Sequence, residues 1–217
     1  MEKILEPILN SPRLKDYVAE LQEFLSSEEE RRNFFYNKIT DQEKAEFING
    51  EIVLHSPVVM IHNITLKYLL FAIDKYASHH NLGFVGYEKL MIRLTRNDYE
   101  PDLCFFNQGR ADSFLPNQKL FPAPDFIAEV LSESTEKNDR GIKMEDYAAH
   151  SVKEYWLIEP KRKYVEQYFL KHGSFFLHKM YSEGDVIQSE VINGLQLPVE
   201  AIFNEMANNQ YLKQFFK

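Results

Sequence analysis

Two carboxylates stand in segments that otherwise look like buried strands. Asp102 follows Pro101 and precedes the apolar residues 103–106, and Glu129 lies inside the apolar run of residues 126–131. A carboxylate in a central strand loses several kcal/mol of hydration free energy unless a cation or hydrogen-bond donors compensate it. Each of these positions therefore predicts a charged or hydrogen-bonded partner.

A divalent cation is the partner that fits both carboxylates at once. Two carboxylates on neighbouring strands repel each other unless positive charge lies between them, and we expect a separation of roughly 4–6 Å. Mg²⁺ (or Mn²⁺) is held by one or two carboxylates and keeps water and phosphate ligands. Glu129 alone could instead form a buried ion pair with Lys or Arg, and Asp102 alone could be a turn residue. The pair together favours a metal site.

A helix of about residues 135–150 follows the second carboxylate. It carries Arg140, Lys143 and Tyr147 at spacings of three and four, which place them on one helix face. If that face looks back over Glu129, it brings a cation and a phenol to the metal site. The alternative is an ordinary amphipathic or solvated face.

The surrounding pattern predicts one α/β (α+β) domain with a mixed central β-sheet flanked by helices. Asn49-Gly50 between apolar residues indicates a hairpin. Gly173, Gly184 and Gly194 indicate turns in an antiparallel tail. Periodicity predicts helices at 11–38 and 58–80 and strands at 84–94, 101–106, 124–131 and 154–158.

Composition limits the partners. The net charge of −8 argues against nucleic acid, but residues 137–180 carry 9 basic and 6 acidic side chains, so a locally basic face is possible. The single Cys104 lies in an apolar run and is expected in the core. No apolar window is long enough for a membrane span. We therefore expect a cytoplasmic protein that does not bind membranes.

The order of motifs resembles the Uma-type putative restriction endonuclease family of the PD-(D/E)XK nuclease superfamily. The resemblance covers roughly residues 40–205 and rests on these segments: Asn49-Gly50-Glu51, His55-Ser56-Pro57 with His62, Pro101-Asp102-Leu103, residues 124–132, Ser134-Thr135, Asp139-Arg140, Lys143, Tyr147, residues 152–158, Gly194-Leu195 and Leu197-Pro198. It implies a restriction-endonuclease-like core at 41–217, with residues 1–40 as an N-terminal helical extension of one compact protein.

The resemblance also implies a metal-dependent endonuclease that hydrolyses DNA. Asp102 and Glu129 would be the metal ligands, with Glu51 as an additional acid near the site. His62 could contact phosphate or a metal-bound water, although a lone His is more often structural. We assign His62, Arg140 and Tyr147 to substrate binding.

One departure from the superfamily pattern concerns the catalytic lysine. The usual Lys lies two residues after the second carboxylate, where this chain has Leu131. Either the enzyme is inactive, or the lysine has moved to the next helix at Lys143. Lys137 points elsewhere on a regular helix. We therefore expect Lys143→Ala to abolish cleavage while Mg²⁺ affinity and folding are retained.

Two functions follow from these observations. The first is hydrolysis of DNA phosphodiester bonds by a homodimer, because cutting a duplex requires reaching two strands. The alternative is a catalytically inactive nuclease fold that acts as a nucleic-acid-binding or protein-interaction module. Retention of Asp102, Glu129 and Lys143 favours the first, and the net charge of −8 favours the second.

Overall fold

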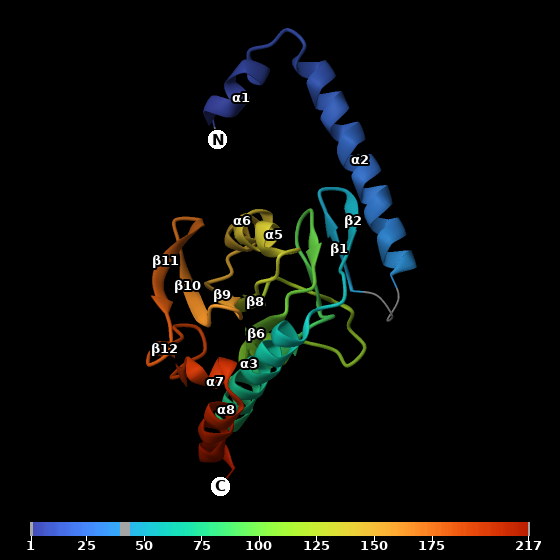
Figure 1. Ribbon diagram of the computed structural model, residues 1–217. Coiled ribbons are helices and arrows are strands. Elements are labelled where there is room, and N and C mark those ends of the chain that lie inside the picture. Colours follow the sequence, from blue (N-terminus) through green and yellow to red (C-terminus); the bar gives the residue numbers. More distant parts are fainter. Residues whose placement is uncertain (1, 40–43, 217) are drawn as a thin grey trace.

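The protein has an α/β architecture in which mixed β-sheets are flanked by helices (Figure 1), as predicted. The computed structural model describes residues 2–39 and 44–216. Within these residues no helix is both long and apolar enough to cross a membrane.

The larger sheet has six strands in the order β11-β10-β9-β8-β6-β3. All neighbours are antiparallel except β8 and β9, which are parallel. The sheet contains the predicted central strands. Its strands are β3 (Gly83–Tyr87), β6 (Leu103–Asn107), β8 (Phe126–Val130), β9 (Glu154–Glu159), β10 (Tyr164–Lys171) and β11 (Ser174–Tyr181).

A second sheet has five short strands in the order β2-β1-β5-β4-β7. Asn49 and Gly50 both have positive φ, 51° and 86°, as a two-residue type I′ hairpin turn requires, which confirms the predicted hairpin. The strands are β1 (Ala45–Ile48), β2 (Glu51–Leu54), β4 (Met91–Arg93), β5 (Asp98–Tyr99) and β7 (Leu120–Phe121).

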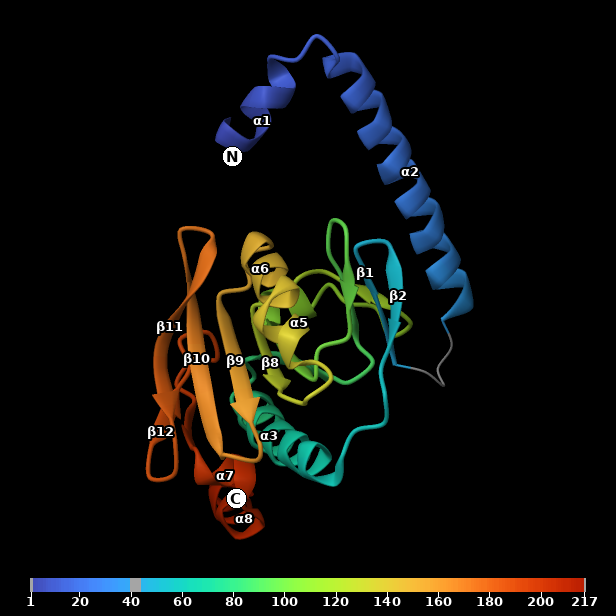
Figure 2. The same cartoon turned by 45° about the horizontal axis from the view of Figure 1, so that its top comes forward.

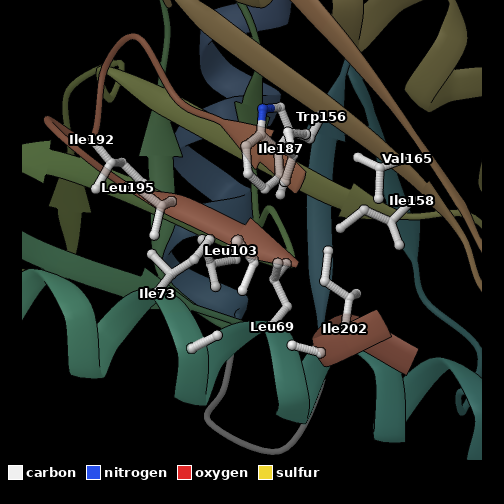
Figure 3. Packing of buried hydrophobic residues seen from close by; sticks show 14 of the residues in the cluster. Leu69, Ile73, Leu103, Trp156, Ile158, Val165, Ile187, Ile192, Leu195 and Ile202 are labelled. Carbon is white, nitrogen blue, oxygen red and sulfur yellow. The ribbon is translucent and has the colours of Figure 1, made fainter. Parts of the chain in front are cut away.

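The two faces of the six-stranded sheet have separate cores. Leu103, Ala128 and Trp156 pack toward helix α3 (Met60–His79), where Leu69 and Ile73 meet them (Figure 3). The C-terminal elements complete this face; they are β12 (Val186–Gln188), β13 (Gln196–Pro198), α7 (Glu200–Phe203), α8 (Glu205–Leu212) and η1 (Lys213–Phe215).

The opposite face carries the alternate residues of the same strands. Cys104, Ile127 and Leu157 belong to a second cluster that includes Tyr147. Because side chains alternate along a strand, Asp102 and Glu129 fall on this second face together with Cys104 and Ile127. The buried Cys104 is a core residue, as predicted.

Two predicted elements are divided. Residues 84–94 form β3 and β4, which belong to different sheets. The helix expected at 135–150 is two helices, α5 (Glu136–Arg140) and α6 (Ile142–Ala149), because Gly141 takes φ −111° and ψ −107°. A Cβ at Gly141 would lie 2.8 Å from the Lys137 carbonyl oxygen, which is why glycine stands at this break. Another short helix, α4 (Gln108–Ala111), follows β6.

The N-terminal residues form a helical arm. Helix α1 (Glu2–Leu9), which the periodicity did not predict, precedes α2 (Leu14–Lys38), and both views show the arm projecting away from the sheets (Figures 1 and 2). The apolar face predicted on α2 is largely in solvent, since Leu21 is 55% and Phe24 47% exposed. The expected boundary between extension and domain, at residues 40–41, lies outside the described residues.

Helix α2 is attached to the second sheet by a buried ion pair. Arg32 donates from Nε to Asp98 Oδ2 at 2.7 Å and from Nη2 to Asp98 Oδ1 at 2.9 Å. Its guanidinium also reaches the carbonyl oxygens of Leu94 and Thr95, at 2.8 and 3.0 Å. Tyr36 donates to the same carboxylate at 2.7 Å. The arm is therefore held by charge-assisted hydrogen bonds at its C-terminal half.

Replacing Arg32 by Met should destabilise the protein by about 3–5 kcal/mol, because Asp98 then remains buried without its counter-charge. Chemical denaturation followed by circular dichroism measures this change. Arg13→Met, which removes the exposed pair between the residue before α2 and Asp16, is the matched control and should cost about 0–1 kcal/mol. Equal effects of the two substitutions would contradict this account of α2.

Candidate active site

Asp102 and Glu129 are joined by two hydrogen bonds between neighbouring strands. The Asp102 backbone N–H donates to Glu129 Oε2 at 2.9 Å, and the Val130 N–H donates to Asp102 Oδ2 at 2.9 Å. Asp102 immediately precedes β6, and Glu129 lies in β8, which pairs with β6. The prediction that these carboxylates lie on adjacent strands, facing the same side, is confirmed. Both side chains are buried.

Lys143 sits among three buried carboxylates. Its Nζ lies 3.2 Å from Glu129 Oε1, 3.0 Å from Glu46 Oε1 and 3.1 Å from Asp139 Oδ1. Tyr147, one turn further along α6, donates to Glu129 Oε1 at 3.2 Å. Strand β1, strand β8 and helix α5 thus each contribute one acid around a lysine that α6 provides.

Asp102 has cationic partners of its own. Lys44 Nζ donates to Asp102 Oδ1 at 2.9 Å, and His62 Nε2 lies 3.2 Å from Asp102 Oδ2. Lys44 also lies 3.5 Å from Glu88, and both of these side chains are partly exposed. The side of Asp102 that carries Lys44 is therefore the side closest to solvent.

These partners shift the pKa values of the two carboxylates in opposite directions. Burial raises the pKa of Glu129 despite the opposing positive charge of Lys143, and the negative charges of Asp139, Asp102 and Glu46 act in the same direction as burial. Burial acts in the same sense on Asp102, but His62 and Lys44 hold its pKa well below the usual range. Neighbouring acids whose pKa values are moved apart are typical of functional sites.

The pKa values of the cationic groups are shifted as well. Burial disfavours the charged form of Lys143, but Glu129, Glu46 and Asp139 together raise its pKa. Burial disfavours the charged form of His62 as well, but the hydrogen bond to Asp102 and the negative charge of that carboxylate together raise the pKa of His62. The cluster therefore retains a charged ammonium group in its interior.

The three other residues predicted for the site, His62, Glu51 and Arg140, differ in their distance from the two carboxylates, and only His62 contacts one of them. His62 reaches Asp102 from the first turns of α3. Glu51 is exposed on β2, opposite Ile48 in the hairpin. Arg140 pairs with Glu136 and Glu166, at 2.8 and 2.7 Å, because the break at Gly141 separates it from the face of Lys143.

Glu46, Asp139 and Lys44 belong to the cluster and were not predicted. Glu46 interrupts the apolar strand β1 in the same way as Glu129 interrupts β8, so its sequence signal was available. Asp139 stands four residues before Lys143, a spacing that brings side chains together within one helix and here across two. Lys44 has no comparable signal.

The donor set suits a hard cation only in part. Among residues 2–39 and 44–216, no three Asp, Glu, His or Cys side chains are arranged as a ready metal site. However, four buried carboxylates (Glu46, Asp102, Glu129 and Asp139) share two lysines. Asp139 Oδ1 has Lys143 Nζ, at 3.1 Å, as its ion-pair partner. Because Mg²⁺ needs only one or two protein carboxylates, this excess of acid is compatible with a cation.

Comparison with models of known protein families identifies the family of this chain. The model of the Uma2 family, described as putative restriction endonuclease, matches residues 22–200. The chain belongs to the Uma2 family. The match includes every residue of the Asp102–Glu129–Lys143 cluster. It also begins inside α2, so most of the N-terminal arm lies outside it.

A solved structure shares the fold of this Uma2 protein. It is the crystal structure of a putative nuclease belonging to DUF820 from Anabaena variabilis, with a TM-score of 0.68 and 17% sequence identity. The alignment covers 82% of this chain and 96% of the other. A search of curated protein sequences gives no match. The nuclease fold predicted from the sequence is confirmed.

In EDTA, the raised pKa of Glu129 should make this Uma2 protein less stable as pH rises. Above pH 4.5, the ordinary pKa of the side chain, the unfolded state releases a proton that the folded state retains, so the free energy of unfolding falls. The slope is up to about 1.4 kcal/mol per pH unit and ends above the raised pKa.

Thermal denaturation between pH 5 and 8 tests this dependence with Glu129→Gln, which cannot titrate. The stability of the wild type should fall relative to that of Glu129→Gln over this range. Glu51→Gln, on the exposed edge of the same protein, should follow the wild type. Parallel curves for the wild type and Glu129→Gln would show that Glu129 does not retain its proton on folding.

Proposed function

We propose that this Uma2 protein is a metal-dependent endonuclease that hydrolyses DNA phosphodiester bonds. The observation that supports this most is the arrangement of Asp102, Glu129 and Lys143. Backbone hydrogen bonds join the two carboxylates across neighbouring strands, and the buried lysine pairs with Glu129. The family description and the fold of the Anabaena protein agree with a nuclease.

Asp102 and Glu129 would hold a divalent cation, Mg²⁺ or Mn²⁺. Glu46 replaces Glu51 in this proposal as the additional acid, because Glu46 contacts Lys143 while Glu51 is exposed. When bound, the cation supplies Lewis-acid stabilisation of charge on the phosphate and lowers the pKa of a bound water. Lys44, which is partly exposed beside Asp102, is placed to meet a substrate phosphate.

The side chains of the chain itself would then have separate tasks. His62 and Lys44 keep Asp102 ionised. Tyr147 fixes the orientation of the Glu129 carboxylate by donating to Oε1. Lys143 supplies a fixed positive charge next to the reacting phosphate and water, in a buried position where such a charge acts strongly. Arg140, tied to Glu166, is left to contacts with more distant phosphates.

The alternative is an inactive nuclease fold that binds nucleic acid or protein. One observation favours it: both oxygens of Asp102 and of Glu129 already have protein partners, among them Lys44 and Lys143. A metal must compete with these ammonium groups. The net charge of −8 acts in the same direction by disfavouring DNA.

We further propose a homodimer that uses the helical arm. Large apolar side chains are exposed along α1 and α2, namely Leu5, Leu9, Val18, Leu21, Phe24 and Leu25. An exposed apolar face of this extent is typical of an interface. A two-fold pair would bring two active sites to one duplex.

Cleavage of plasmid and single-stranded DNA tests the nuclease proposal. We expect cleavage with Mg²⁺ or Mn²⁺ and none in EDTA. Lys143→Met should lower the rate by roughly 10²–10³, the effect of removing one electrostatic stabiliser. Lys137→Met on the exposed side of α5 is the control and should cleave like the wild type.

Burial of Lys143 changes the earlier expectation for folding, since its removal leaves three carboxylates without a counter-charge. Tyr147→Phe, which only removes a hydrogen bond to Glu129, is therefore measured in parallel and should also slow cleavage. Mn²⁺ titration by calorimetry should show binding that Glu129→Gln weakens. A folded wild type that binds DNA but cleaves none with either metal would favour the alternative.

Light scattering at micromolar concentration tests the dimer. The wild type should have the mass of two chains, and Leu21→Glu with Leu25→Glu should give the mass of one, because charges replace the apolar face of α2. Phe176→Glu, at an equally exposed position on β11, should leave the mass unchanged. A wild-type monomer would contradict the proposal.

A further inference from the structure

A pocket with a volume of about 760 Å³ lies next to the Asp102–Glu129 site. It is formed by α2, β3, β4, β7 and the segment that joins α4 to β7, together with Glu100. Volumes of about 300–1,000 Å³ are typical of pockets that enclose a small organic group. None of the residues assigned above to the nuclease chemistry lines this pocket.

Glu100 connects the pocket to the candidate active site. Its backbone N–H donates to Glu46 Oε1 at 3.0 Å, and that oxygen also accepts from Lys143. Its side-chain Oε2 accepts from the Ala45 N–H at 3.1 Å, next to Lys44. The pocket and the cluster therefore share one wall, made by the segments 44–46 and 100–102.

The lining of the pocket combines flat aromatic rings with a few charged groups. Phe84, Phe114 and Phe121 contribute rings, with centroids 5.1 Å apart for Phe114 and Phe121. Phe84 and Phe121 lie nearly parallel, at 23°, while Phe114 is perpendicular to both. Glu100 is buried and Lys119 is exposed. The pocket thus offers an apolar interior, a buried carboxylate and two exposed lysines, Lys89 and Lys119.

We propose that this pocket takes an unstacked nucleotide of the strand that is cleaved, with its base against the phenylalanine rings. Aromatic side chains bind bases of any sequence by stacking. A buried carboxylate accepts from an exocyclic amino group of a base. Lys119 then pairs with a phosphate of the same strand. The inference rests on the proposed nuclease function and adds a preference for single-stranded or distorted DNA.

Binding measured in EDTA tests the pocket without requiring hydrolysis. The probe is a short fluorescein-labelled single-stranded oligonucleotide, followed by anisotropy. Ala111→Trp fills the pocket from α4 and should raise Kd roughly 5- to 150-fold, the range for losing one stacked base. Lys119→Gln should weaken binding and lower the salt dependence by about one phosphate contact.

The controls are matched in chemistry and lie on α8 and η1, away from the pocket and from the proposed dimer interface. Ala207→Trp and Lys213→Gln should bind as the wild type does. Competition by dCMP and dAMP, added as free nucleotides, should be lost in Ala111→Trp. If decanoate displaced the labelled oligonucleotide and neither dCMP nor dAMP did, the inference would be overturned, because the pocket would then be a site for an apolar carboxylate.

The outcomes also separate this inference from the nuclease proposal. Unchanged oligonucleotide affinity in a folded Ala111→Trp overturns the pocket assignment, even if the wild type cleaves DNA. Pocket-dependent binding by a protein that never cleaves supports the pocket and contradicts the nuclease. Preferred cleavage of single-stranded over duplex DNA, lost in Ala111→Trp, supports both.

Discussion

The site depends on the ion pairs that the buried ammonium group of Lys143 forms with three carboxylates. A buried lysine is costly unless carboxylates surround it, and each buried carboxylate is costly without a cation. Glu46 from β1, Glu129 from β8 and Asp139 from α5 meet this group within 3.0–3.2 Å. Strand β1 is thereby fixed to β8, α5 and α6, about 80 to 100 residues further along the chain, which ties the small sheet to the large one at the site.

The alternation of strand residues explains why the charges gather on one face. Asp102 lies two residues before Cys104, and Glu129 two residues after Ile127. Because residues two apart point to the same face of a sheet, both carboxylates point away from the core that α3 covers. That core is closed by aliphatic side chains such as Leu69 and Ile73 (Figure 3), and its one acid from β9, Glu154, accepts hydrogen bonds from Trp156 and Gln167. The opposite face, covered by α5, α6 and the second sheet, carries the groups of the candidate site.

Much of this arrangement could be predicted from particular residues. The carboxylates inside apolar strands identified Asp102 and Glu129, and Asn49-Gly50 identified the hairpin. Glu51 was named because the resemblance includes the Asn49-Gly50-Glu51 motif, but Glu51 is exposed on β2, whereas Glu46 is buried on β1.

The helix after β8 was harder to predict, because a three- and four-residue spacing assumes one regular helix. The backbone conformation of Gly141 interrupts the helix, so Arg140 forms its ion pair with Glu166 and Lys143 forms one with Glu129. Apolar periodicity in α2 was also correct as a pattern. The pattern could not show whether the apolar face of α2 packs against this chain or against a second chain. Periodicity shows that a helix is amphipathic, but it does not identify what covers the apolar face.

The position of the lysine illustrates what the geometry of such a site requires. Leu131 stands where the superfamily pattern has its lysine, and it is buried among apolar residues of the second face. A lysine there would have to replace that packing. Helix α6 covers the same face and delivers Lys143 to 3.2 Å from Glu129 Oε1, with Asp139 and Glu46 as further partners. The electrostatic field at a carboxylate depends on where the ammonium lies and not on which element carries it. If the proposed nuclease function holds, a lysine on α6 can therefore act on Glu129 in place of one at position 131, because α6 packs on the same face.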